Sequence, residues 1–148
     1  MATKRELCNA EDDGWHEING LIESLTPQQM EEPGYYPEWS GKDLLAHLAA
    51  WMAEAARMLT QVHYGTYLKR DLDVDAMNKE FYEANRDLPL PVVRAEAFAA
   101  RNRMLSEMNA TPEVSPEAED WFQESGPRHY QEHLPRLREW VEELRSRS

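Results

Sequence analysis

Residues 39–51 read Trp-Ser-Gly-Lys-Asp-Leu-Leu-Ala-His-Leu-Ala-Ala-Trp, and this stretch carries nearly every signal of a helix start. Ser40 is a predicted N-cap, because its hydroxyl can accept a hydrogen bond from a free N–H of the first turn. Asp43, three residues later, completes a capping box and places negative charge at the positive end of the helix. The pattern predicts a long helix over residues 41–63, with Gly65 as its stop.

Apolar residues recur at helical spacing after this cap and define the face that turns toward the core: Leu44, Leu48, Trp51, Ala55, Met58 and Val62. Trp39, just before the cap, has the spacing of a hydrophobic staple with Leu44. His47 lies within the apolar stripe rather than opposite it. A histidine that points toward a core is either a hydrogen-bonded core residue or a ligand, and its position alone favours the core residue.

The chain has 148 residues, a formal net charge of −12 and a single cysteine, Cys8. This length fits one domain over residues 1–148. The acidity argues against nucleic acid, whose phosphates bind basic surfaces, and against an anionic membrane surface. A lone cysteine excludes an internal disulfide, and Cys8 has no evident basic partner, so we interpret it as a packing residue rather than a nucleophile. Because no apolar run suits a membrane span or a signal peptide, we expect a cytoplasmic protein that binds neither nucleic acid nor membranes.

Three further segments have the apolar periodicity of long helices: residues 3–25, 92–109 and 125–145. A shorter helix is predicted over residues 76–85, capped by Asp75, in the connection between the second and third long helices. Pro135 is expected to kink the last helix, because proline removes a hydrogen bond and its ring clashes with the preceding turn. Strand-like alternation is absent, so the chain predicts an all-α, up-and-down four-helix bundle with one short extra helix.

The remaining segments, residues 26–38 and 111–126, are predicted as connectors rather than helices. Tyr35 and Tyr36 on the first connector could cover the mouth of a pocket, but an ordinary packed loop is the favoured interpretation. Trp121 and Phe122 are expected to anchor the second connector to the core.

His129 and His133 are four residues apart on the last predicted helix, which puts both imidazoles on one face, one turn apart. Helical zinc ligands use this spacing, because two neighbouring nitrogens can reach one ion about 2 Å away. A third ligand has to come from elsewhere, and His47 is the other histidine on an inward face. Three histidines would leave a metal position open to water or substrate, and neutral imidazoles suit zinc or nickel better than magnesium or calcium. His16 and His63 lie off the apolar stripes or near helix ends and are interpreted as surface residues.

The spacing alone leaves two interpretations of this pair open, a metal site and a solvated helix face. Glu132 lies between the two histidines and completes the order of the inverted H-x-x-E-H motif. Two of the five positions in that motif are free, so the match does not predict a protease. The last helix has to turn its apolar residues inward, and His133 lies one turn before the first of them, Leu137. We therefore expect His129 and His133 to point into the bundle toward His47.

Residues 39–51 resemble the second helix of the DinB-like superfamily, and residues 129–140, His-Tyr-Gln-Glu-His-Leu-Pro-Arg-Leu-Arg-Glu-Trp, resemble its fourth helix. Residues 75–90 are similar to the ClbS/DfsB branch, which is related to colibactin self-resistance proteins. The resemblance covers most of the chain and implies a DinB/YfiT-like four-helix bundle that is often a homodimer. It also implies a metal held by one histidine of the second helix and two of the fourth, which match His47, His129 and His133.

The same resemblance implies several functions. Superfamily members include thiol-dependent transferases and isomerases, and the ClbS/DfsB branch implies protection against a reactive small molecule, with ring-opening hydrolysis as its chemistry. The leading interpretation is a metal-dependent enzyme that acts on a small electrophile by hydrolysis or thiol transfer, in detoxification or self-protection. Such an enzyme would use zinc or nickel and a low-molecular-weight thiol. Two alternatives stay open: a protein that sequesters a toxic small molecule without turnover, and a protein whose metal is only structural.

Four further residues are candidates for the pocket around the three histidines. Trp51 and Glu54 lie about one and two turns beyond His47 on nearly the same face. Trp51 could wall the pocket, and Glu54 could orient water or act as a general base. The alternatives are core packing for Trp51 and a buried or rim carboxylate for Glu54. Asn78 and Tyr82, four residues apart on the short helix, share a face that is expected to line the substrate site.

Overall fold

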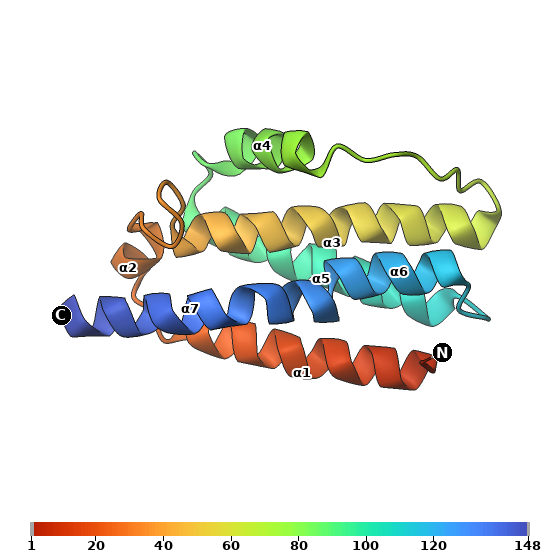
Figure 1. Cartoon of the computed structure of the whole chain (residues 1–148), viewed down its shortest axis with the longest axis horizontal. Helices are drawn as coiled ribbons and strands as arrows, with labels where there is room; N and C mark the ends of the chain where they lie inside the picture. Colours follow the sequence, from red (N-terminus) through yellow and green to blue (C-terminus); the bar gives the residue numbers. More distant parts are fainter. Residues whose placement is uncertain (1, 148) are drawn as a thin grey trace.

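The structure, a computed structural model, describes residues 2–147 and is helical, with no strand in that range. Four long helices form the bundle: α1 (Lys4–Glu23), α3 (Gly41–Tyr64), α5 (Leu90–Ala110) and α7 (Pro127–Arg147). Three shorter helices lie in the connections between them: α2 (Pro27–Glu31), α4 (Val74–Asn85) and α6 (Pro116–Ser125). The predicted all-α four-helix bundle, with an extra helix before the third long helix, is confirmed (Figure 1). Within the described residues no helix is long and apolar enough to cross a membrane.

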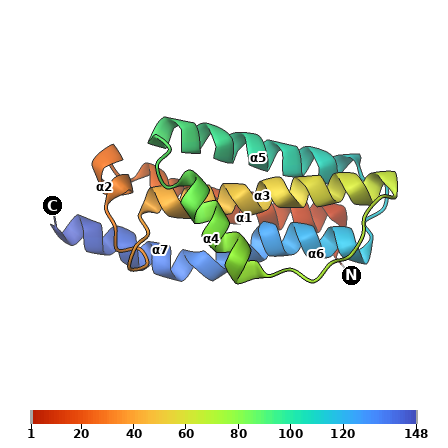
Figure 2. The same cartoon turned by 90° about the horizontal axis from the view of Figure 1, so that it is seen from above.

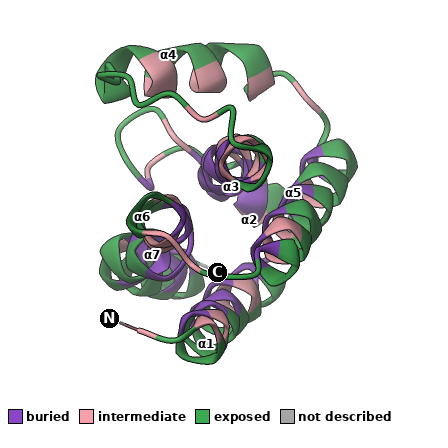
Figure 3. Ribbon diagram, turned by 90° about the vertical axis from the view of Figure 1, so that its right-hand side faces the viewer, coloured by how far each residue is buried: buried purple, intermediate pink, exposed green. Residues whose placement is uncertain are grey.

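The long helices lie around one core, as the end-on view in Figure 3 shows. α3 and α5 run in the same direction, because residues 65–89 return along the bundle and carry α4 on its outside (Figures 1 and 2). The helix directions therefore do not alternate strictly, since a long crossover replaces one of the short connections. α4 contacts α3, whereas α6 contacts both α3 and α7.

Capping residues set the helix ends largely where the sequence predicts them. The side chain of Ser40 accepts a hydrogen bond from the Asp43 N–H, and the Asp43 carboxylate accepts one from the Ser40 N–H, which completes the predicted capping box. Gly65 ends α3 at φ 73°, a left-handed conformation that glycine adopts without steric cost. α4 begins earlier than predicted, because the side chain of Asp73 caps it and Asp75 lies within its first turn.

Two helices, α2 and α6, occupy segments predicted as connectors. Thr26 and Ser115 cap them, and each cap is followed by a proline at the first helical position, where a missing N–H costs little. Helices of five and ten residues are too short to show a clear apolar period, so the cap followed by proline was the available signal. Phe122 of α6 is completely buried and anchors this helix to the core, as predicted for that residue.

The apolar faces predicted for the long helices are buried in the core. α1 and α7 approach closely at Gly14, where an added Cβ would lie 2.8 Å from Cδ2 of Tyr130. The absence of a side chain at Gly14 lets the aromatic ring pack directly on the helix backbone. α7 continues as one helix through Pro135, which lies on its exposed side.

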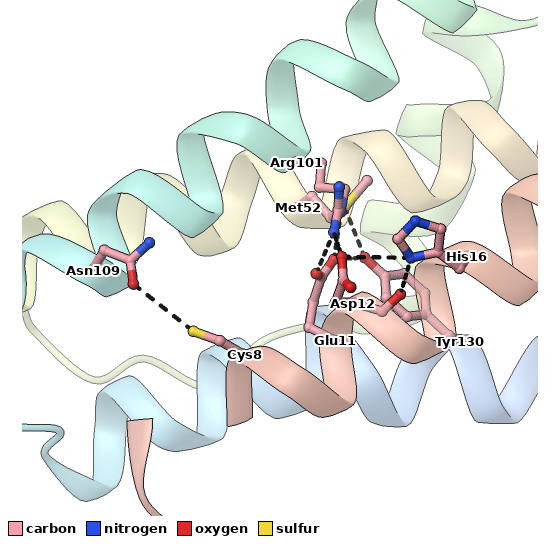
Figure 4. Close-up of polar contacts among 8 residues, drawn as sticks. All are labelled: Cys8, Glu11, Asp12, His16, Met52, Arg101, Asn109 and Tyr130. Carbon is pink, nitrogen blue, oxygen red and sulfur yellow. Dashed lines mark hydrogen bonds and ion pairs between the residues drawn. The ribbon is translucent and has the colours of Figure 1, made fainter. Parts of the chain in front are cut away.

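A buried polar cluster built on an ion pair joins α1, α5 and α7 (Figure 4). Glu11 is completely buried, and its two carboxylate oxygens accept hydrogen bonds from the guanidinium of Arg101 at 2.8 and 2.7 Å. The hydroxyl of Tyr130 donates to the same carboxylate at 2.7 Å. Because charge-assisted bonds of this kind are strong, the cluster ties three helices together and leaves none of its carboxylate oxygens unpaired.

Cys8 lies on α1 and is half-buried, with its Sγ 3.9 Å from Oδ1 of Asn109 on α5. Burial, and the nearby charge of Glu11, raise the pKa of the Cys8 thiol. A raised pKa disfavours the reactive thiolate, so the environment of Cys8 suits the predicted packing role.

Candidate metal centre

Three histidines meet between α3 and α7. His47 is carried inward with its buried neighbours on α3, whereas His129 and His133 share the inward face of α7. All three are buried, with 7%, 7% and 5% of their surfaces exposed, respectively. The three imidazoles therefore converge in the direction expected from the helical spacing, while metal binding by them stays a prediction.

The ring nitrogens of the three histidines are close enough to share one ion. Nε2 of His47 and Nε2 of His129 are 2.9 Å apart, and one nitrogen from each ring lies within 4.8 Å of the other two. An ion about 2 Å from each of three nitrogens in tetrahedral geometry would hold those nitrogens about 3.3 Å apart. The observed separations bracket this value, so the three residues are placed where a single ion could be held.

The nitrogens that face away from this meeting point differ in their partners. Nδ1 of His133 is 2.8 Å from the hydroxyl of Tyr35, which is itself completely buried. Nδ1 of His47 and Nδ1 of His129 are buried and have no hydrogen-bond partner within residues 2–147. An unsatisfied buried nitrogen costs about 1–3 kcal/mol, so this cluster leaves binding capacity unused. The three converging imidazole donors fit a divalent transition metal, and the buried triad could hold one.

Burial keeps these imidazoles neutral. Loss of water, together with the smaller effect of the neighbouring histidines, lowers the pKa of His47 to about 3 and the pKa of His129 to about 2. Burial also lowers the pKa of His133 to about 4. The neutral imidazole is the form that binds a metal ion, so all three rings are in the ligand-competent state at neutral pH.

The triad opens onto a cavity of about 560 Å³. Besides the three histidines it is lined by Tyr36, Trp39, Trp51, Leu72, Val74, Asn78, Asp120, Trp121, Glu124 and Glu132. The Trp39 ring packs on His47 with 4.9 Å between ring centroids, and Tyr82 stacks on Trp39 with 6.0 Å between centroids. Trp39, predicted only as a staple at the helix cap, is therefore a wall of the cavity beside a candidate ligand. A cavity of this size suits a small molecule.

The predicted substrate-site residues differ in how they meet this cavity. Trp51 and Asn78 both line it, and Nε1 of Trp51 donates a hydrogen bond to Oδ1 of Asn78 at 2.7 Å. Tyr82 lies behind Trp39 and faces a smaller hollow, so it supports the wall of the main cavity instead of lining it. Their roles in substrate binding stay predictions.

Glu54, the predicted catalytic carboxylate, is not brought to the cavity. It lines a separate hollow together with Arg103 and Glu107 of α5, and its carboxylate is paired with Arg57 on α3. Two helical turns span about 11 Å along the axis, so sharing a helix face with His47 does not bring Glu54 close to that ring. The catalytic role of Glu54 stays a prediction that its position does not support.

The segment before α3, residues 32–40, closes one side of the cavity with Tyr36. Arg136 of α7 donates hydrogen bonds to the carbonyl oxygens of Tyr35 and Gly34, at 2.6 and 2.7 Å. Gly34 has φ 127° and lies against the Trp140 ring, where a side chain would clash. The sequence favours an ordinary packed loop here and does not predict that the segment closes the cavity. The hydrogen bonds that hold the segment in place come from Arg136, which lies 101 residues beyond Tyr35 in the sequence.

α6 supplies a side of the cavity that sequence reasoning missed. Asp120, Trp121 and Glu124 line it, and Glu132 joins them from α7. Nε1 of Trp121 donates a hydrogen bond to the hydroxyl of Tyr67 at 3.1 Å. The four-residue spacing of Asp120 and Glu124 would have placed both on one helix face, but the helix itself was not predicted.

A four-helix bundle whose second and fourth long helices bring three buried imidazoles to one cavity defines a DinB-like protein. The chain belongs to the family described as the mycothiol maleylpyruvate isomerase N-terminal domain, whose sequence pattern matches residues 12–144. This match includes the whole candidate centre and confirms the resemblance to the DinB-like superfamily. No curated protein sequence matches the chain.

Two solved structures share the fold over almost the whole chain. A crystal structure of an uncharacterised protein from Escherichia coli UTI89 has a TM-score of 0.81 and 19% sequence identity, over 97% of this chain and 95% of that one. A crystal structure of the colibactin self-resistance protein ClbS in complex with a dsDNA has a TM-score of 0.80 and 17% identity, over 95% of this chain and 96% of that one. The similarity to the ClbS branch is thus confirmed at the level of the fold.

The ClbS complex also corrects one expectation. The expectation of no nucleic-acid partner, which rested on the net charge of −12, is wrong, because a protein of the same fold is seen with double-stranded DNA. Net charge is a sum over the whole surface, whereas phosphates contact a local part of it. The acidity of this chain therefore does not decide whether nucleic acid is a partner.

Proposed function

We propose that the protein is a metal-dependent enzyme that acts on a small electrophilic molecule, by thiol transfer or hydrolysis. One observation carries this proposal: three buried, neutral imidazoles, each with one nitrogen within 4.8 Å of the other two, open onto a cavity of about 560 Å³. Imidazole nitrogens that converge beside a cavity favour a metal ion with room for a substrate over a purely structural role.

The ligands in this proposal are His47, His129 and His133, and zinc or nickel is the metal that imidazole donors favour. When bound, such an ion supplies a Lewis acid that lowers the pKa of a thiol or a water and polarises a substrate oxygen. Three protein ligands would leave a position open to the cavity for that thiol or water. Tyr35 holds the ring of His133 through Nδ1 at 2.8 Å, which keeps Nε2 of that ring free for the ion.

The aromatic walls have a separate role, which is to hold the substrate and exclude water. Trp51 is fixed by its hydrogen bond to Asn78, and Trp39 is packed between His47 and Tyr82. Rings held in this way keep an apolar surface facing the reacting group. A dry site strengthens the electrostatic interactions that act on a developing charge.

The family description favours thiol transfer over hydrolysis. It names mycothiol, a low-molecular-weight thiol, so a thiol of this kind is the second substrate we propose. A thiolate that attacks an epoxide carbon would form a C–S bond as the C–O bond breaks, and the alkoxide would take up the proton that the thiol released. Such a reaction would serve detoxification, which is the physiological role we assign.

A second candidate is a protein that captures a toxic small molecule without turnover. It is supported by the shared fold with ClbS, which is described as a self-resistance protein. It is also supported by the placement of Glu54 outside the cavity, which leaves the predicted general base away from the three histidines. In that case the aromatic cavity would bind the molecule, and a metal would be structural or absent.

The test uses protein purified without a nickel column. We expect about one divalent ion per chain by elemental analysis. We also expect turnover of epoxides, activated esters or thiol acceptors that depends on both the ion and added mycothiol. His129→Ala should abolish ion uptake and turnover, while the exposed His16→Ala serves as the matched control and should change neither. Absence of any divalent ion, or ion uptake by His129→Ala equal to that of the wild type, would remove the proposal. Stoichiometric capture without product release would favour the second candidate.

A further inference from the structure

We propose that the cavity selects a small molecule that carries a cationic nitrogen group beside an apolar or aromatic body. This inference rests on the proposed function only in placing the substrate in the cavity of the histidine triad. It deepens that proposal by naming the chemical class that the outer part of the cavity recognises.

The charged side chains that line the cavity are all acidic. They are Asp120 and Glu124 from α6 and Glu132 from α7, and no lysine or arginine of the described chain is among the lining residues. Glu124 accepts a hydrogen bond from Arg128 at 2.8 Å, and that guanidinium also interacts with the charge of Asp120. Neither Asp120 nor Glu132 forms an ion pair within residues 2–147. The three carboxylates, which form the acidic rim of the cavity, therefore keep net negative charge.

Aromatic rings line the same cavity. Tyr36, Trp39, Trp51 and Trp121 line the cavity together with the three carboxylates. A cation near the face of a tryptophan or tyrosine ring is attracted by the ring quadrupole, and cages of such rings recognise ammonium groups. Carboxylates beside aromatic rings therefore favour a cation that also has apolar surface.

Part of the capacity of this lining to bind an anion is already used. The indole N–H of Trp51 already donates to Asn78, and the indole N–H of Trp121 already donates to Tyr67. Two donors that could have bound a carboxylate are thus in use. An incoming anion would instead approach the negative rim, where like charges repel.

The acidic rim is not an isolated patch, because the inner end of the cavity points to a ligand independently. His47, His129 and His133 are all more than nine-tenths buried and line the cavity, and one nitrogen from each ring lies within 4.8 Å of the other two. The cavity thus has a nitrogen-rich inner end and an acidic outer rim. A substrate that fits both ends places its reactive or electron-rich group inward and its cation outward.

One consequence separates this chain from the substrate named in its family description. Maleylpyruvate is a dicarboxylate, and a dianion would meet three carboxylates with no lysine or arginine among the lining residues of the described chain. The outer part of the cavity therefore favours a cationic group, while an ion held by the triad would attract an electron-rich group at the inner end.

The experiment compares three probes of similar size on the full chain: benzyltrimethylammonium, benzyl alcohol and phenylacetate. Binding is followed by quenching of tryptophan fluorescence and by calorimetry. We expect benzyltrimethylammonium to bind about tenfold more tightly than benzyl alcohol, the size of one good cation–π or close charge interaction, and phenylacetate to bind least. Added salt should weaken binding of the cation, because it screens the rim.

The variants test whether the rim carboxylates cause this preference. Asp120→Asn with Glu132→Gln keeps the side-chain shapes and should reduce affinity for the cation about tenfold, while benzyl alcohol binding is unchanged. Glu142→Gln, an exposed carboxylate of α7 outside the cavity, removes one charge from the same helix and should leave all three affinities as they are. Phenylacetate binding as tightly as the cation, or the double variant retaining full affinity for the cation, would overturn the inference.

Metal content and turnover of the same preparations separate the two proposals. A cation preference that depends on the rim, in protein without metal-dependent turnover, supports this inference and counts against the proposed function alone. Metal-dependent turnover without any cation preference overturns this inference alone.

Discussion

The two buried polar clusters of this bundle use consecutive residues of α7 but satisfy their polar atoms in different ways. Tyr130 joins Glu11 and Arg101 in a network whose carboxylate oxygens accept bonds from a guanidinium and a hydroxyl (Figure 4). His129 joins the triad, where Nδ1 of two histidines has no partner within residues 2–147 and the rings open onto a cavity. The cluster of Glu11, Arg101 and Tyr130 is closed, because both carboxylate oxygens have partners within it. The histidine triad is open, because its rings line a cavity.

This difference separates a structural role from a functional one. In the closed cluster the opposite charges of Glu11 and Arg101 compensate each other, so its contribution is to hold α1, α5 and α7 together. By fixing Tyr130 it also fixes the rotation of α7, which turns the neighbouring His129 toward the cavity. The open cluster brings three neutral imidazoles together beside a cavity, which favours a bound group.

Breaking the closed cluster should cost the most stability. Glu11→Ala leaves the guanidinium of Arg101 without its buried partner, so we expect the free energy of unfolding in urea to fall by about 3–5 kcal/mol. Asp12→Ala removes the exposed partner of the same guanidinium and should cost less than about 1 kcal/mol. If Glu11→Ala does not fold, the isosteric Glu11→Gln replaces it. Equal stability of the Glu11 and Asp12 variants would contradict the assigned difference.

Breaking the open cluster should remove ligand-dependent stability. With zinc at about 100 times its dissociation constant, the wild type should gain about 2.7 kcal/mol over the metal-free protein. His47→Ala should gain nothing, because it loses one of the three ligands, while the exposed His63→Ala should gain as much as the wild type. Thermal melting with and without zinc measures both, and a full zinc-dependent gain in His47→Ala would exclude that residue as a ligand.

Tyr35→Phe tests the one partnered Nδ1 of the triad. Loss of the hydroxyl that lies 2.8 Å from Nδ1 of His133 should weaken zinc affinity about 10–100-fold, because such partners orient the ligand ring. Competition with a chromophoric chelator measures the dissociation constant, and the visible spectrum of the cobalt-substituted protein reports the ligand geometry. Tyr64→Phe, at an exposed tyrosine, is the control. An unchanged affinity would make the contact with Tyr35 a packing contact only.

The pH dependence of the metal-free protein gives the smallest effect. Burial lowers the pKa of His47 to about 3 from 6.5, so the unfolded chain takes up a proton near pH 6.5 while the folded ring stays neutral. This contribution to stability is full above pH 6.5 and is lost as the pH falls toward 3. Between about pH 7.5 and 6.0, His47→Ala should lose about 0.8 kcal/mol less stability than the wild type. Urea titrations of the wild type and His47→Ala at the two pH values measure this difference. An equal loss of stability in both proteins would contradict the prediction.

Much of the fold follows from local patterns in the sequence. The box of Ser40 and Asp43 starts α3, and Gly65 ends it, because capping depends on residues within one turn. The inward direction of His129 and His133 follows from helical periodicity relative to Leu137. α2 and α6 are not predicted from the sequence because they are too short for periodicity to show. The N-cap of α4 is Asp73 rather than the predicted Asp75, and local sequence does not separate the two because they have the same side chain.

The sequence by itself determined the all-helical bundle, the ends of its main helices and the three histidines that face inward, since each depends on spacings of a few residues. Only the tertiary structure decided that Trp39 and Tyr36 wall the cavity, that Tyr35 pairs with His133, and that Glu54 lies elsewhere. It also decided that three carboxylates from α6 and α7 form the rim. These features depend on contacts between segments far apart in the chain, such as the 98 residues that separate Tyr35 from His133, and no local pattern specifies such contacts.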